Sequence, residues 1–196
     1  MALTTRDRIL RAAIAVVREA GLAGATTRAI AESAGVAEGS IYRNFEDKTD
    51  LIRTAITEYL LPDFIELLRS LPSRVGTKTP QAHLRTVATR ALAFYRDVLP
   101  MWSALSANVE LRESFRAHTG GGEIGPHLAI SGVARYIDLE QQRGRIPQHI
   151  DPKAAAQMLL GSVFQQAFFS QLVGEDHMPL PDDKLVERTV RTLLKG

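Results

Sequence analysis

The chain has 196 residues, of which 45% are hydrophobic, 23% charged and 6% aromatic. This composition is typical of a compact globular protein with one or two domains and excludes a disordered, fibrous or membrane chain. Because there is no cysteine, disulfides, a thiol nucleophile and a cysteine-ligated metal are excluded. The longest apolar run near the start, residues 12–17, is too short to span a membrane. We therefore expect a cytoplasmic protein without a membrane anchor.

The overall charge is close to neutral, with 24 basic and 22 acidic residues, although the calculated pI is 9.1. Residues 1–60 contain equal numbers of basic and acidic side chains, so this part of the chain carries no net charge. Bulk charge therefore does not indicate a nucleic-acid partner. Evidence for one must come from the positions of individual residues.

Apolar residues recur at helical spacing through almost the whole chain, and no run alternates as a strand would. We predict an all-α protein of about nine helices. The first helix begins after Thr4, which has Asp7 as its capping-box partner, and ends at Gly21.

Two short helices follow. Thr26 is the predicted N-cap of the first, and Gly35 ends it in a left-handed conformation. The second covers residues 38–44 and buries Ile41 against the first. Two short helices joined by a three-residue turn form a helix-turn-helix motif, which we place at residues 27–46.

The later helices are longer. Asp47 caps one that is kinked at Pro62, and a loop is predicted over residues 72–80. The next helix is expected to end at Leu99, before Pro100 opens a separate piece. Three further helices are predicted over residues 127–143, 154–173 and 182–195.

A dense residue pattern covers the helix-turn-helix motif and the start of the next helix. It consists of Thr26, Thr27, Arg28, Ala29, Ile30, Ala31, Ala34, Gly35, Val36, Gly39, Ile41, Tyr42, Phe45 and Lys48. With this pattern the sequence resembles the TetR family of bacterial transcriptional regulators. The match is dense over residues 4–60 and only architectural beyond them. The resemblance implies a DNA-binding domain over residues 1–50 and a regulatory, ligand-binding and dimerisation domain over residues 51–196.

In proteins of this family the second short helix enters the major groove of double-stranded DNA. We expect its outward-projecting side chains to be those of Glu38, Ser40, Tyr42, Arg43 and Asn44. Arg43 suits the O6 and N7 acceptors of guanine, and Asn44 suits adenine. Helix N-termini attract phosphates, which favours the threonines and Lys48 as backbone contacts. The predicted DNA-binding residues are Arg6, Thr26, Thr27, Arg28, Gly39, Ser40, Tyr42, Arg43, Asn44 and Lys48.

Ala37 and Asn44 depart from the family pattern, and Glu38 is an acidic residue on a surface expected to meet phosphates. Ala37 stands where a capping hydroxyl is frequent in the family, so the second helix has no expected side-chain cap. Asn44 stands where histidine or tyrosine is common, which leaves the recognised DNA sequence open. Glu38 either faces a cytosine amino group or points to solvent. Arg6, with Arg8 and Arg11, lies either on an arm that contacts phosphates or on the solvated face of the first helix.

The last two helices predict a homodimer. Apolar residues cover most of the circumference of the helix at 154–173, more than one packing face requires. Two copies related by a two-fold axis would read a pseudo-palindromic operator. The predicted interface residues are Phe164, Phe168, Leu172, Val190 and Leu193.

The resemblance also implies an apolar small-molecule effector that releases a repressor from DNA. The aromatic residues that either line its pocket or belong to the core are Phe64, Phe94, Tyr95, Trp102 and Phe115. The alternatives are a TetR-type DNA-binding protein without an effector, acting as an activator or on the nucleoid, and a helical adaptor or enzyme that does not bind DNA.

No catalytic or cofactor motif supports the enzyme alternative. The five histidines lack metal-ligand spacing, and the glycines at 120–125 lack the lysine and hydroxyl residue of a phosphate-binding loop. We therefore expect no enzyme activity, no metal and no cofactor.

Overall fold

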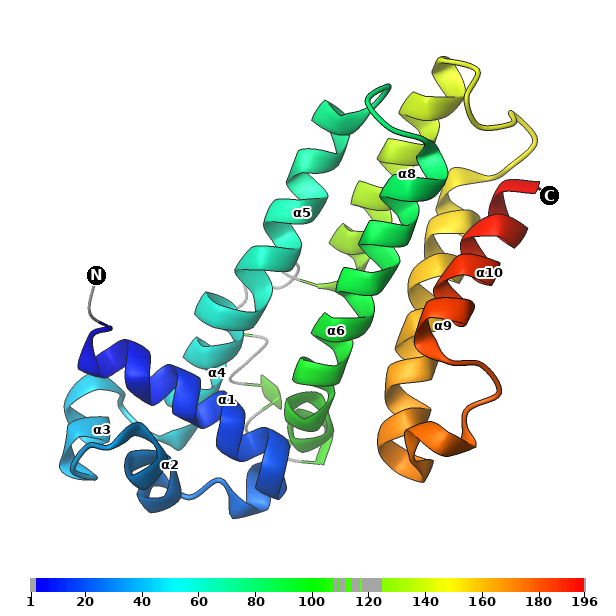
Figure 1. Ribbon diagram of the computed structural model, residues 1–196. Helices are drawn as coiled ribbons and strands as arrows, with labels where there is room; N and C mark the ends of the chain where they lie inside the picture. The colour runs from blue at the N-terminus through cyan, green and yellow to red at the C-terminus, as the bar shows by residue number, and fades with distance from the viewer. Residues whose placement is uncertain (1–2, 108, 110–111, 114–116, 118–124, 196) are drawn as a thin grey trace. The chain divides into compact units, whose positions relative to one another are not determined.

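The computed structural model describes residues 3–107, 109, 112–113, 117 and 125–195. Every regular element within these residues is a helix, which confirms the predicted all-α fold (Figure 1). The chain divides into two compact units. The first comprises Met1–Pro62 with Asp97–Glu123, and the second comprises Asp63–Arg96 with Ile124–Gly196. Among the helices described, none has the length and apolar character needed to cross a bilayer.

The first unit contains the predicted short helices. Its elements are α1 (Thr5–Gly24), α2 (Thr27–Ala34), α3 (Gly39–Asn44), α4 (Lys48–Ala55) and the π-helical turn η1 (Ile56–Leu60). The capping box of Thr4 and Asp7 is present, and Thr26 and Asp47 cap α2 and α4 as predicted. The backbone leaves the helical conformation at Gly21, but helical residues continue to Gly24.

Apolar side chains hold the first unit together. Ile9 and Leu10 of α1, Ile30 of α2, Ile41 of α3 and Leu51 of α4 are all fully buried. Each such burial contributes roughly 1.5 to 3 kcal/mol. The two short helices are therefore fixed by packing on α1 and on each other, because isolated helices of this length are not stable.

The wide turn η1 precedes Pro62, where we predicted a kink. In a regular α-helix the proline ring would clash with the carbonyl of Glu58, four residues earlier. A π-helical turn over Ile56–Leu60 provides one physical way to relieve this clash while the chain continues into a helix.

The second unit is built from longer helices. Its elements come from α5 (Leu61–Arg74), α6 (Pro80–Ala107), α8 (Pro126–Gln142), α9 (Pro152–Val173), the 3₁₀ turn η2 (Glu175–His177) and α10 (Asp182–Lys195). Two predicted boundaries are wrong, because Pro72 lies inside α5 and Pro100 inside α6. Their neighbours Leu71 and Leu99 are buried, and this packing outweighs the single backbone hydrogen bond that each proline removes.

A buried polar cluster joins α8 to the loop before α6. The carboxylate of Glu140, which is 0% exposed, accepts hydrogen bonds from Tyr136 Oη at 2.8 Å and from Gly76 N at 3.3 Å. Arg145 Nε lies 3.3 Å from its other oxygen. Burial and the bond to Glu140 raise the pKa of Tyr136. Nearby His83, also buried, lies with its ring edge-on to Tyr136.

One side of α9 packs on α8 and α10 (Figure 1), and large apolar side chains elsewhere on this helix are exposed. Large apolar side chains of α9 between 36% and 68% exposed are Met158, Phe164, Phe168, Phe169, Leu172 and Val173. Val190 of α10 is a different case, because it is only 1% exposed in the single chain. It has almost no surface to offer to another subunit, so its predicted place in the interface is corrected to the core of the second unit.

Candidate nucleic-acid interface

The N-terminal ends of α2 and α3 are linked by polar side chains. Thr26 Oγ1 accepts from the backbone of α2 as its N-cap, while the next hydroxyl, Thr27 Oγ1, donates to Glu38 Oε1 at 2.6 Å. Tyr42 Oη lies 3.4 Å from the same Thr27 hydroxyl, and the tyrosine side chain is 58% exposed. Three side chains, from α2, from α3 and from the residue that precedes α3, therefore form one exposed cluster, which we call the Thr27–Glu38–Tyr42 cluster.

The second short helix carries the predicted base-contacting residues. Arg43 and Asn44 are exposed, as expected for side chains that meet a partner. Ser40 differs from the expectation that it projects outward, because it is only 8% exposed. Its hydroxyl accepts from Arg43 Nη2 at 2.9 Å, and its carbonyl accepts from Asn44 Nδ2 at 2.7 Å. Ser40 thus orients the two exposed side chains from beneath.

The start of α3 is open. A Cβ atom added at Gly39 would meet nothing within 4 Å, so another molecule can approach the backbone there. As Ala37 suggested, no side chain caps this helix.

Arg8 of α1 supports the turn of the motif. Its guanidinium donates to the carbonyls of Ala34 and Gly35, with the shortest bond 2.6 Å. Gly35 has φ +63°, and a Cβ there would lie 3.0 Å from Arg8 Nη2. The sequence does not predict this role of Arg8, because a contact between residues 26 positions apart leaves no local signal.

Arg6 forms a brace between elements of the first unit. Both of its terminal nitrogens donate to the Glu58 carboxylate of η1, at 2.5 and 2.9 Å, and its guanidinium lies 5.5 Å from the centre of the Phe45 ring. The bond from Arg6 lowers the pKa of Glu58. Arg6, a predicted phosphate contact, is therefore held by residues of the protein itself: Glu58 in η1 and Phe45, which follows α3.

The other predicted basic contacts lie at the ends of the short helices. Arg28 is exposed and pairs with Glu32, one turn further along α2, at 3.0 Å. Lys48 is half-buried at the start of α4, and this burial lowers its pKa.

The aromatic residues predicted to line a ligand pocket are only partly brought together. In the second unit, the Phe64 and Phe94 rings stack at 5.1 Å, Tyr95 lies 5.6 Å from Phe94, and Phe164 lies 5.3 Å from Tyr95. Burial raises the pKa of Tyr95 to about 12. Trp102 belongs to the first unit. Phe115 lies outside the described residues.

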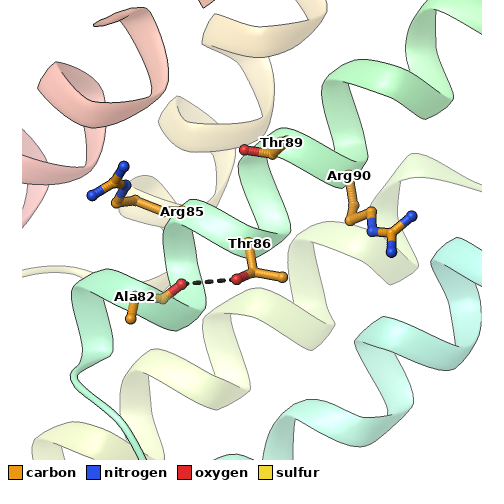
Figure 2. Close-up of a pocket in the computed structure, with 5 residues that line it drawn as sticks. All are labelled: Ala82, Arg85, Thr86, Thr89 and Arg90. Carbon is orange, nitrogen blue, oxygen red and sulfur yellow. Dashed lines mark hydrogen bonds between the residues drawn. The ribbon is translucent and has the colours of Figure 1, made fainter. Parts of the chain in front are cut away.

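A depression of about 400 Å³ on α6 is lined by Ala82, Arg85, Thr86, Thr89 and Arg90 (Figure 2). None of the predicted aromatic residues lines it. Figure 2 shows the Arg85 and Arg90 guanidinium groups pointing away from each other, so they do not converge on an anion. All five residues come from one helix and four are exposed, which makes this an open helix surface rather than an enclosed pocket.

A helix-turn-helix unit with exposed polar side chains on its second helix, joined to a larger helical unit, defines the class of helix-turn-helix transcriptional regulators. The profile of the bacterial regulatory proteins of the tetR family matches residues 9–55. The chain is also 38% identical over 203 residues to the HTH-type transcriptional regulator YvkB of Bacillus subtilis, covering 98% of this chain and 96% of that protein. The chain belongs to the TetR family, and its helix-turn-helix is a DNA-binding motif.

Solved structures share the fold over nearly the whole chain. FadR from Bacillus subtilis, in complex with stearoyl-CoA, matches with a TM-score of 0.67 and 19% identity, covering 96% of this chain and 97% of FadR. SmeT, the repressor of the Stenotrophomonas maltophilia multidrug efflux pump SmeDEF, matches with a TM-score of 0.64 and 22% identity, covering 97% of this chain and 87% of SmeT. At 19% and 22% sequence identity, these two matches show a shared fold alone.

Proposed function

We propose that the protein is a homodimeric, sequence-specific repressor that binds a pseudo-palindromic operator and leaves it when an apolar or amphipathic small molecule binds. The observation that carries the proposal is the exposure of Arg43 and Asn44 on a short helix that packs on α1 and α2. Such a protein acts in the cytoplasm, on the nucleoid when it is bound to DNA.

The roles of the DNA-binding residues follow from their positions. Arg43 can exchange its bond with the neutral Ser40 hydroxyl for a bidentate contact with guanine, which discriminates against other bases by about 1 to 3 kcal/mol. Asn44 is placed to contact adenine. Thr26, Arg28 and Lys48, at or near the starts of α2 and α4, are placed to hold phosphates, which position the protein without reading sequence.

The open face of α9 is the proposed dimer interface. Between residues 154 and 173 this helix has no charged side chain, and Phe164, Phe168 and Leu172 are exposed on it. A second copy related by a two-fold axis presents the same face, so each apolar patch covers the other. Leu193 of α10 is half-buried and retains surface for the same contact.

The proposed effector is apolar because the second unit contains the continuous aromatic series from Phe64 to Phe164. Two fold relatives support this class of ligand, since one is solved with stearoyl-CoA and the other represses a multidrug efflux pump. For release to occur, the ligand must bind the DNA-free conformation more tightly than the DNA-bound one.

Selection of fragments from genomic DNA, followed by affinity measurements on the enriched site, tests the DNA-binding part. Arg43→Ala is expected to lose about 1 to 3 kcal/mol and to relax preference at one base pair. Lys48→Ala should weaken binding to all sequences and lower the salt slope by about one. If both variants retain sequence-specific binding unchanged, the site assignment is wrong.

Sedimentation tests the dimer. Phe168→Glu places a charge in the apolar face and is expected to give monomers that bind the operator poorly. Thr89→Glu, which adds the same charge on the exposed side of α6, is the matched control and should leave the dimer intact. A folded Phe168→Glu monomer with normal operator binding would refute the proposed interface.

Thermal-shift screening with fatty acyl thioesters and hydrophobic drugs tests the effector. A binder should raise the melting temperature of the free protein and lower its operator affinity. If no compound changes operator affinity, the protein is a DNA-binding regulator without this kind of effector.

A further inference from the structure

The Thr27–Glu38–Tyr42 cluster contains an acidic group on a surface that the proposed function brings against DNA. Glu38 is exposed and directly precedes α3, whose N-terminal residues meet base edges when such a helix lies in the major groove. A carboxylate is repelled by phosphates, so on this surface it is favoured where the DNA offers it a hydrogen-bond donor. Exocyclic amino groups of the bases are such donors in the major groove.

The contact with Thr27 holds the carboxylate in one place. The 2.6 Å bond from Thr27 Oγ1 engages Glu38 Oε1, and a carboxylate can accept further hydrogen bonds at its second oxygen. Because this hydroxyl donates to Glu38, it cannot donate its proton to a phosphate at the same time. Thr27 thus serves Glu38 rather than the DNA backbone.

We propose that Glu38 is a specificity-determining residue that accepts a hydrogen bond from the N4 amino group of a cytosine, and that Thr27 is its positioning residue. This inference rests on the proposed DNA binding through α3. Adenine also carries an amino group, but its N7 acceptor lies beside that group and repels a carboxylate. Guanine and thymine present acceptors in its place, so they leave the carboxylate desolvated and unpaired.

The open backbone at Gly39 agrees with this assignment. A Cβ at this position would meet nothing within 4 Å, so a base edge can approach the backbone directly beside Glu38. The recognition surface then combines donors at Arg43 and Asn44 with an acceptor at Glu38, so that it reads more than one kind of base edge.

The test uses the full-length protein and a library of random duplexes. The wild type should enrich a cytosine at one position of each half-site, with a preference of about 5- to 150-fold in competition against the other bases. Glu38→Gln should reduce this preference below about 3-fold and raise the affinity for scrambled DNA, because a negative charge is removed. Glu19→Gln removes the same charge from an exposed position on α1 and should change neither quantity.

Thr27→Val tests the positioning role, because it keeps the shape of the side chain and removes the hydroxyl. It should weaken the same cytosine preference and no other, and it should add nothing to the effect of Glu38→Gln in the double variant. If Thr27→Val instead lowers the affinity for every sequence equally, the threonine holds a phosphate and the positioning role is refuted.

Replacing the selected cytosine by 2-pyrimidinone, which lacks only the amino group, should weaken the wild type but not Glu38→Ala. Equal weakening of both proteins would overturn the proposal, as would a cytosine preference that Glu38→Gln leaves intact. A wild-type protein that enriches no sequence at all would instead refute the proposed function.

Discussion

Each unit of the protein contains a glutamate that accepts a short hydrogen bond from a hydroxyl, but the two glutamates differ in exposure. In the first unit, Glu38 accepts from Thr27 at 2.6 Å and is exposed at the surface of the helix-turn-helix. In the second unit, Glu140 accepts from Tyr136 at 2.8 Å and is 0% exposed. Exposure determines what each can do, because only the first can accept a further hydrogen bond from a group on another molecule.

The comparison separates a binding role from a structural one. Glu140 is surrounded by a phenol, a backbone amide and the Arg145 guanidinium, all from the same unit. Removing a buried charge leaves its partners uncompensated and lowers stability. Removing the exposed Glu38 should have little effect on stability and a specific effect on binding.

The largest expected effect is that of Glu140→Ala on folding. The change leaves the Arg145 charge and the Tyr136 hydroxyl without their partner, and the loss of one member of a buried ion pair typically costs about 3 to 5 kcal/mol. Because 29% of the Arg145 side chain is exposed and can be solvated, we expect the lower value, about 3 kcal/mol. Urea unfolding of the two proteins measures the difference.

Glu187→Ala is the matched control for this change. Glu187 lies on α10, is 43% exposed and is 3.9 Å from both Lys184 and Arg191. Exposed pairs of this kind contribute about 0 to 1 kcal/mol, so the free energy of unfolding should hardly change. If Glu140→Ala is no more destabilising than Glu187→Ala, the buried cluster is not a structural tie.

The sequence predicted local features of both units, and it missed contacts between distant residues. The N-caps at Thr4, Thr26 and Asp47 depend on residues within one turn, so the capping pattern was sufficient to find them. Contacts of Arg6 with Glu58 and of Thr27 with Glu38 join residues 52 and 11 positions apart. They depend on how helices pack, which no local pattern encodes.

The same reason explains the errors at the prolines and in the site. Pro72 and Pro100 have the local signals of helix ends, but burial of the residues beside them keeps the helices continuous. Ser40 has a residue type suited to contact DNA, yet packing places it beneath the surface. Residue type identified the candidate helix, whereas burial determines which of its side chains are exposed.

A smaller effect is expected when alanine replaces a glycine, and its sign should differ between the units. Gly35 ends α2 with φ +63°, and alanine in this conformation costs about 1 to 2 kcal/mol. Gly132 lies within α8, where an added Cβ would make ordinary contact with Leu68 Cβ at 3.7 Å. Because alanine favours the helix over glycine, Gly132→Ala should stabilise by up to about 1 kcal/mol. Melting temperatures measure both changes, and equal signs would contradict this explanation.

The smallest expected effect is a pH dependence of stability that belongs to the second unit. Burial lowers the pKa of His83 below its ordinary value of 6.5, the charges of Arg74, Lys78 and Arg145 act in the same direction, and Glu140 opposes them. Above pH 6.5 the ring is neutral in the folded and unfolded states. As the pH falls below 6.5, the unfolded chain takes up a proton that the folded chain does not, so stability decreases toward the folded pKa.

Urea unfolding of the wild type and of His83→Gln between pH 7.5 and pH 5.0 tests this pH dependence. In the wild type, His83 Nε2 lies 3.1 Å from Thr77 Oγ1, and the glutamine keeps a polar group toward that hydroxyl. The wild type should lose stability more steeply below pH 6.5 than the variant. In the first unit, the bonds from Arg6 and Thr4 lower the pKa values of Glu58 and Asp7 below 4.5 and 3.8, so their contributions are lost only in more acidic solution. Parallel pH profiles of the two proteins would show that His83 stays accessible to protons in the fold, and would remove this difference between the two units.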